Sequence, residues 1–153
     1  MSRVSRYVVV GLFIATLFMG TTAFADRTLL LRYPDIHNGM VAFSYGGDLW
    51  TVSEGGGTAR RVTGHTRGME IHPKFSPDGQ WIAFTGDYDV NENVYLVPAI
   101  GGEPKCLTFH PARDRVIDWT PDGKVLFSTR RGARWRVATP RRPATNRGEQ
   151  RRR

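Results

Sequence analysis

The sequence predicts an all-β fold that forms part of a β-propeller, and three observations lead to this prediction. One strand-opening phrase occurs three times, as NGMVAF at 38–43, DGQWIAF at 78–84 and DGKVLF at 122–127. A second phrase follows the first two copies in the same order, as DLWTVSEGGGTARRVT at 48–63 and NVYLVPAIGGEPKCLT at 93–108. No window after residue 26 shows the 3.6-residue apolar period of a helix. Two phrases in a fixed order indicate that one structural unit is repeated.

A tight turn is predicted at the same point of the second and third repeats. The SPDG corner has Ser first, Pro second and Gly fourth, which is the preference of a type I turn. Asp78 and Gly79 are therefore assigned to a repeated turn, and Asp122 and Gly123 of TPDG are assigned to its second copy.

The segments after each turn are predicted to be short antiparallel strands. WIAF at 81–84 and NVYLVP at 93–98 are bulky and apolar at successive positions, which is expected where both faces of a strand are covered. Gly101 and Gly102 offer the positive φ of a hairpin turn before the chain returns. Units of about four strands recurring every 40 to 45 residues are typical of propeller blades, which cover one another. A β-sandwich is the competing fold, but it does not require two phrases in fixed order.

The repeat spacing sets the expected organisation of the chain. The propeller region is predicted to cover residues 26–136 as two four-stranded blades and part of a third, with limits near 33–71, 72–118 and 119–136. Residues 137–153 are predicted to form an Arg-rich disordered tail. This tail stands where the repeat requires another strand, so a lost reading frame after about Arg136, or a truncated gene, is our hypothesis for its origin.

The first 25 residues are predicted to be a secretory signal peptide, whose helix precedes the propeller. Arg3 and Arg6 form a basic start, residues 7–20 are mainly apolar, and small residues precede a cleavage expected after Ala25. A retained membrane anchor is the alternative, although the 18 residues from 7 to 24 are marginal for spanning a bilayer and include three threonines. Either interpretation predicts export, to the periplasm or the cell exterior.

Positive charge is concentrated at the C-terminal end of the chain. The formal net charge is +8, but residues 130–153 hold ten of the 22 Lys and Arg and only one of the 14 acids. The rest of the chain is therefore close to neutral. Binding of nucleic acid through phosphate neutralisation is consequently a hypothesis for the tail alone, and no specific nucleic-acid partner is expected.

Neither a nucleophile nor a cofactor site is predicted from the residues themselves. The serines sit in predicted strand ends or turns without a GxSxG elbow, and they are Ser44, Ser53, Ser76 and Ser128. Ser76 is better explained as the first residue of its turn. The single cysteine, Cys106, excludes an internal disulfide and lies in no metal or redox motif.

No metal site is predicted either. The four histidines lack paired-ligand spacing, and they are His37, His65, His72 and His110. His72 and His110 each precede a proline, at what we expect to be equivalent positions between strands. DYDVNEN at 87–93 begins like a calcium loop but lacks the required Gly and Glu, so a solvated hairpin loop is the default and a weak oxygen-ligand site the alternative.

Residues 28 to about 132 resemble the opening of the tricorn-type proteases. LRYPDI, GDLWTV and the join between TFHP and WTPDGKVLF carry the resemblance, whereas FSPDG with IAF is shared with TolB-type and prolyl-oligopeptidase-related propellers. The resemblance implies an N-terminal propeller fragment of an exported serine peptidase, which guides or filters peptides. The nucleophile, the base and the substrate-terminus anchors that it implies lie downstream, so no catalytic residue is assigned here and no peptidase activity is expected from this chain alone.

The partners expected from this resemblance are peptides and the remaining propeller, PDZ and peptidase portions. A non-enzymatic, TolB-like periplasmic propeller that binds partner proteins is the alternative function. Because fewer than four blades leave apolar faces uncovered, self-association of the chain is also expected. No cofactor is expected, and contact with a membrane is expected only through the signal segment.

Overall fold

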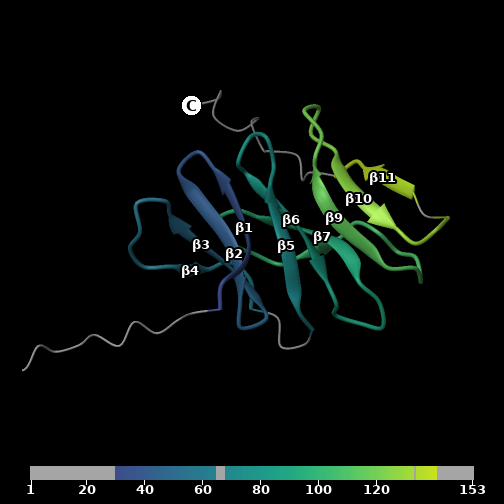
Figure 1. Cartoon of the computed structure of the whole chain (residues 1–153), viewed down its shortest axis with the longest axis horizontal. Coiled ribbons are helices and arrows are strands. Elements are labelled where there is room, and N and C mark those ends of the chain that lie inside the picture. Colours follow the sequence, from purple (N-terminus) through teal and green to yellow (C-terminus); the bar gives the residue numbers. More distant parts are fainter. Residues whose placement is uncertain (1–29, 65–67, 133, 141–153) are drawn as a thin grey trace, which may run out of the picture.

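Three antiparallel sheets follow one another along the described part of the chain (Figure 1). The computed structural model describes residues 30–64, 68–132 and 134–140. The first sheet contains β1 (Arg32–His37), β2 (Met40–Tyr45), β3 (Asp48–Ser53) and β4 (Arg60–Arg61). The second sheet contains β5 (Glu70–Phe75), β6 (Trp81–Gly86), β7 (Asn93–Pro98) and β8 (Lys105–Cys106). The third sheet contains β9 (Asp114–Trp119), β10 (Val125–Thr129) and β11 (Arg134–Ala138). No described residue is helical, and the all-β prediction is confirmed.

The repeated corners join the first two strands of their sheets. In SPDG, between β5 and β6, the backbone N–H of Gly79 donates to the carbonyl of Ser76 at 2.8 Å. In TPDG, between β9 and β10, the N–H of Gly123 donates to the carbonyl of Thr120 at 2.9 Å. Both corners lie at the same edge of their sheets as the turn between β1 and β2 (Figure 1). The corners therefore occupy equivalent settings.

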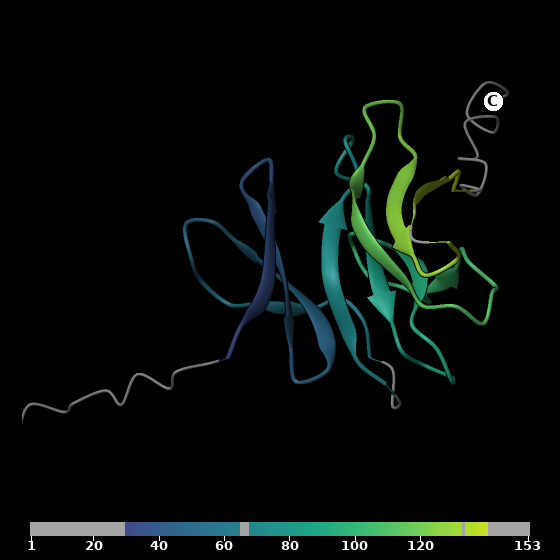
Figure 2. The ribbon, with the colours of Figure 1, turned by 45° about the vertical axis from the view of Figure 1, so that its right-hand side comes forward.

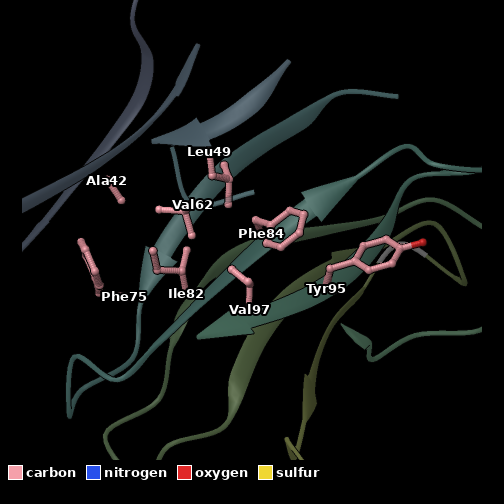
Figure 3. Close-up of a cluster of buried hydrophobic side chains, with 8 residues drawn as sticks. All are labelled: Ala42, Leu49, Val62, Phe75, Ile82, Phe84, Tyr95 and Val97. Atoms are coloured by element: carbon pink, nitrogen blue, oxygen red, sulfur yellow. The ribbon is translucent and has the colours of Figure 1, made fainter. Parts of the chain in front are cut away.

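The first and second sheets pack face to face, because apolar side chains of both point into the space between them. This first core cluster is drawn in Figure 3 and consists of Ala42, Leu49, Val62, Phe75, Ile82, Phe84, Tyr95 and Val97. Phe84 is the largest of its members that are fully buried.

The second and third sheets pack in the same way, which leaves the second sheet in the middle (Figure 2). Alternation along β7 sends Tyr95 and Val97 toward the first sheet, and Val94 and Leu96 toward the third. All four side chains are buried. Strands that are apolar at every position are thus explained by sheets that cover one another, which is the arrangement of propeller blades.

The outer face of the third sheet carries apolar side chains exposed to solvent. Val125 and Phe127 of β10 point inward to the second core cluster. On β11, Trp135 and Val137 alternate with the inward-packed Ala138 and are 71% and 47% exposed. They correspond to the buried Val94 and Leu96 of the second sheet.

The first strands of the three sheets lie next to one another, because β5 contacts both β1 and β9. Each of these strands pairs with its neighbour through a register shift. In β1 and β5 the shift coincides with Tyr33 and His72, which both have positive φ (54° and 55°) and precede a proline. Their rings are in contact, with centroids 4.2 Å apart.

The sheets correct the blade limits expected from the repeat. The expected limit between residues 118 and 119 falls inside β9, which pairs with β10 in the third sheet. The limit at residue 72 likewise divides β5. The physical reason is that each PDG corner is a hairpin, so the strand before the corner belongs to the same sheet as the strand after it. The disordered tail predicted from residue 137 also overlaps β11, which ends at Ala138.

The predicted signal peptide with its cleavage after Ala25, and the tail from residue 141 onward, lie outside the described residues. Within the described ranges, no helix is long and apolar enough to cross a bilayer.

Candidate functional site: an arginine-lined pocket

A pocket of about 180 Å³ lies where β9 begins and β10 ends. Its lining residues are Arg113, Arg115, Ser128, Thr129 and Arg130. The hairpin between β9 and β10 builds the pocket, because antiparallel pairing places Arg115 opposite Ser128. Arg113, just before β9, and Arg115, its second residue, thereby lie near Arg130, which follows the end of β10.

The pocket carries an excess of positive charge. Arg115 forms an ion pair with Glu92 from the loop between β6 and β7. Within the described part of the chain, no carboxylate forms an ion pair with Arg113 or Arg130. The lining residues carry three positive charges and Glu92 supplies one negative charge, so this group of side chains has a net charge of +2. Guanidinium groups bind carboxylates and phosphates through paired N–H donors, so the pocket is suited to an anion.

An ion pair between the buried Asp114 and Arg131 lies next to the residues that line the pocket. Asp114 lies between Arg113 and Arg115 in sequence, and its carboxylate is fully buried. One carboxylate oxygen, Oδ2, accepts from Arg131 Nη2 at 2.7 Å. The backbone N–H of Asp114 donates to the carbonyl of Glu92 at 2.8 Å. These bonds fix the first residue of β9, and through it the backbone that carries Arg113 and Arg115.

The ion pair between Glu92 and Arg115 shifts the pKa values of both groups. Hydrogen bonding to Arg115 lowers the pKa of the Glu92 carboxyl, against the opposing effect of partial burial. Hydrogen bonding to Glu92 raises the pKa of the Arg115 guanidinium. Both groups therefore stay charged at neutral pH.

The three histidines of the described ranges, His37, His72 and His110, do not come together, and the expected equivalence of His72 and His110 is wrong. His72 lies inside β5, where its counterpart is Tyr33 of β1, whereas His110 lies in the loop before β9. His72 and Pro73 are the third and fourth residues of β5, whereas His110 and Pro111 precede the first residue of β9, so proline position alone misaligns the two segments. Burial lowers the pKa of His72, and the charge of Arg115 lowers it further. His37 ends β1, and His65 lies outside the described residues.

The serines are likewise separate from the pocket, apart from Ser128 in its lining. Ser76 donates to Asp78 Oδ1 at 2.5 Å and its oxygen accepts from the N–H of Trp81, as a turn residue does. Ser44 and Ser53 lie in β2 and β3. In the described ranges, no group of three or more His, Cys, Asp or Glu is arranged to hold a metal ion.

The loop at 87–93 is tied to its surroundings by side chains that the sequence left unassigned. Tyr88 donates from its hydroxyl to Glu70 Oε1 at 2.5 Å, and Glu92 holds Arg115. The Asn93 side chain donates to the carbonyl of Asn91 at 3.4 Å.

The arginine pocket itself was missed by sequence reasoning. Arg113 and Arg115 belong to ARDRV, whereas Arg130 was counted with the Arg-rich end of the chain. The signal that could have located the pocket is the hairpin itself, since pairing across TPDG brings the start of one strand beside the end of the next.

The family of tricorn protease N-terminal β-propeller domains matches residues 28–150. The chain therefore belongs to this family of propeller domains. Tricorn protease homolog 1 of Streptomyces coelicolor is 39% identical over 97 residues, which are 63% of this chain and 9% of that protein. The chain thus spans only a small part of the length of this relative.

Solved structures agree with the family. The crystal structure of the tricorn protease matches 65% of this chain and 11% of its own, with a TM-score of 0.58 and 26% identity. TolB from Acinetobacter baumannii matches 65% of this chain and 26% of its own, with a TM-score of 0.51 and 21% identity. The TolB likeness concerns the fold alone.

Proposed function

We propose that this propeller domain holds peptides for a tricorn-like serine peptidase by binding their carboxylate end. The observation that supports this most directly is the pocket beside the first strand of the third sheet, whose lining residues Arg113 and Arg130 form no ion pair among the described residues. A terminal carboxylate has the planar, two-oxygen shape that such groups bind. Membership of the tricorn propeller family supports peptides as the carriers of that carboxylate.

In this proposal the domain guides or filters peptides and leaves hydrolysis to peptidase portions beyond it. The chain matches 9% of the length of the Streptomyces relative, so the rest of such a protein has room for those portions. The nucleophile and the base are expected there, so neither is assigned to Ser44, Ser53, Ser76 or Ser128.

Calorimetric titration with N-acetyl-pentaalanine tests the proposal on the 153-residue chain. The peptide with a free carboxylate should bind roughly tenfold more tightly than its C-terminal amide, since the amide removes the charge that the pocket recognises. Arg113→Gln should weaken binding of the free acid by a similar factor. Lys105→Gln, which removes one positive charge from exposed β8, is the matched control and should bind like the parent chain. Equal affinity for acid and amide would overturn the proposal.

Binding of a protein partner, or of a second copy, is the second candidate function. It is supported by apolar side chains on the two outer faces, since Ile36 of the first sheet is 60% exposed and Trp135 of the third is 71% exposed. Light scattering after size-exclusion chromatography tests self-association. Trp135→Lys should shift the chain toward monomer, and an unchanged mass distribution, or a parent chain that is already monomeric, would count against it.

We also propose that the protein is exported, on the basis of the signal-like sequence at residues 1–25. Mass spectrometry of the protein from cell fractions tests this. An N-terminus at Asp26 outside the cytoplasm is expected, and an intact Met1 in the cytoplasmic fraction would contradict it.

A further inference from the structure

Glu92 joins the second sheet to the arginine pocket of the third. It is the last residue before β7, yet its side chain crosses to β9. Glu92 Oε2 accepts from Arg115 Nε, and Oε1 accepts from Arg115 Nη2 at 2.7 Å. The carbonyl of Glu92 also accepts from the N–H of Asp114. One residue thus holds both a side chain and the backbone at the start of β9.

The carboxylate of Glu92 binds Arg115 without being part of the pocket lining. Arg115 is among the residues that line the pocket, and Glu92 is not. A guanidinium group has five N–H donors in one plane, and Glu92 takes two of them along the Nε edge. The Nη1 end is left to bind something else. Glu92 therefore does not fill the pocket in place of a ligand.

The loop that carries Glu92 is held at its other end as well. Tyr88 donates from its hydroxyl to Glu70, which is 1% exposed between the first and second sheets. The loop is thus tied to a buried group on one side and to the pocket on the other. A side chain carried by such a loop can hold Arg115 in one orientation.

We propose that Glu92 is a positioning residue for the carboxylate-binding pocket: it fixes the guanidinium of Arg115 so that the free end of this group faces a bound peptide carboxylate. This inference rests on the proposed function. Glu92 acts through Arg115 and does not touch the ligand.

Charge and positioning predict opposite changes in peptide affinity for Glu92→Gln, so this variant distinguishes them. Glu92→Gln removes a negative charge beside a cationic pocket, so charge alone predicts tighter binding of an anion. Positioning predicts the opposite, because an amide places N–H donors against the N–H groups of Arg115 and releases its orientation. Binding of N-acetyl-pentaalanine should therefore weaken about fivefold in Glu92→Gln.

Matched variants separate positioning from other effects. Glu103→Gln makes the same charge change at an exposed loop residue and should leave binding unchanged or slightly tighter. Glu92→Asp keeps the carboxylate and should recover part of the affinity. Arg115→Gln should weaken binding, and adding Glu92→Gln to it should cause no further loss, since Glu92 acts only through Arg115.

Calorimetry on the full chain, with circular dichroism confirming that each variant folds, decides the matter. Tighter or unchanged binding by Glu92→Gln would overturn the inference, as would additive losses in the double variant. If instead Arg113→Gln has no effect, the proposed carboxylate pocket fails, whatever Glu92 does. If Glu92→Gln unfolds, the affinity of Glu92→Asp decides: a partial loss supports positioning, and unchanged binding contradicts it.

Discussion

The junction between the first and second sheets and the junction between the second and third sheets each contain a buried carboxylate at the first residue of a strand, but the two carboxylates have different partners. The first residue of β5 is Glu70 and the first residue of β9 is Asp114, and both carboxylates are buried. Glu70 accepts from three neutral donors: the N–H of Leu49 at 3.0 Å, the hydroxyl of Tyr88 and the hydroxyl of Thr63. Asp114 instead pairs with a cation, Arg131, and its other oxygen, Oδ1, has no partner among the described residues.

The length of the side chain accounts for this difference. In both junctions a threonine hydroxyl accepts the N–H of the first apolar residue of the third strand, at 2.9 Å from Thr63 to Leu49 and 3.0 Å from Thr108 to Val94. The longer Glu70 reaches this point and joins the bond, whereas Asp114 is one methylene shorter and does not. The first junction is therefore closed by neutral hydrogen bonds, and the second depends on an ion pair beside the arginine pocket.

The largest effect is expected from Asp114→Ala. It leaves the guanidinium of Arg131, whose side chain is 26% exposed, without its partner, so the free energy of unfolding should fall by about 3 kcal/mol. Urea denaturation followed by tryptophan fluorescence measures this. Asp122→Ala removes an exposed carboxylate paired with Lys124 and should change little. A similar loss in both variants would mean that burial of the pair is unimportant.

A smaller loss, about 2 kcal/mol, is expected from Glu70→Ala. The N–H of Leu49 keeps its bond to Thr63, but Tyr88 loses its acceptor. The same denaturation experiment measures the loss, with the exposed Glu54→Ala as the control. If Glu70→Ala lowered the unfolding free energy more than Asp114→Ala does, the distinction between a junction held by neutral hydrogen bonds and one held by an ion pair would be contradicted.

The second junction has a further hydrogen bond that Trp119→Phe removes. The indole N–H of Trp119 donates to the carbonyl of Lys74 at 2.9 Å, across the two sheets. Its loss should cost about 1 kcal/mol of unfolding free energy. Trp50 makes a bond of similar length within its own sheet, to the carbonyl of Tyr45, and that bond is exposed. Trp50→Phe is thus the matched control, and an equal or larger loss there would contradict the assignment.

The smallest effect is on pH dependence, where the junctions should respond in opposite directions. Burial raises the pKa of Glu70 above 4.5, so its contribution to stability is present below that value and is lost as pH rises through the folded pKa. Bonding to Arg115 lowers the pKa of Glu92, so its contribution is present above 4.5 and is lost as pH falls through the folded pKa. Unfolding free energies of Glu70→Gln and Glu92→Gln, compared with the parent from about pH 3 to about pH 8, should diverge accordingly. Parallel curves would refute the comparison.

The stacking of the sheets could be predicted from sequence because it depends on consecutive apolar residues within one strand. Val94, Tyr95, Leu96 and Val97 are all apolar, and only a strand covered on both faces buries all four. The matched ends of the long phrases, Thr63 and Thr108, also proved equivalent, although their role in accepting an N–H was not foreseen.

The pocket and the junction carboxylates could not be predicted, because their partners are distant in sequence. Glu70 and Asp114 stand in dissimilar contexts, MEIHP and RDRVID, so their equivalence appears only once the strands are placed. Arg115 and Glu92 belong to different sheets. Contacts of this kind depend on the angle at which two sheets meet, which the repeat pattern does not specify.

The most direct test of the carboxylate pocket is an NMR titration that follows the Nε–H signals of the arginines while N-acetyl-pentaalanine is added. The signals of Arg113 and Arg130 should shift together and saturate. That of Arg60, whose guanidinium already donates to the carbonyls of Ala99 and Ile100, should stay in place. Shifts at Arg60 but not at Arg113 and Arg130, or equal shifts with the amidated peptide, would contradict the account.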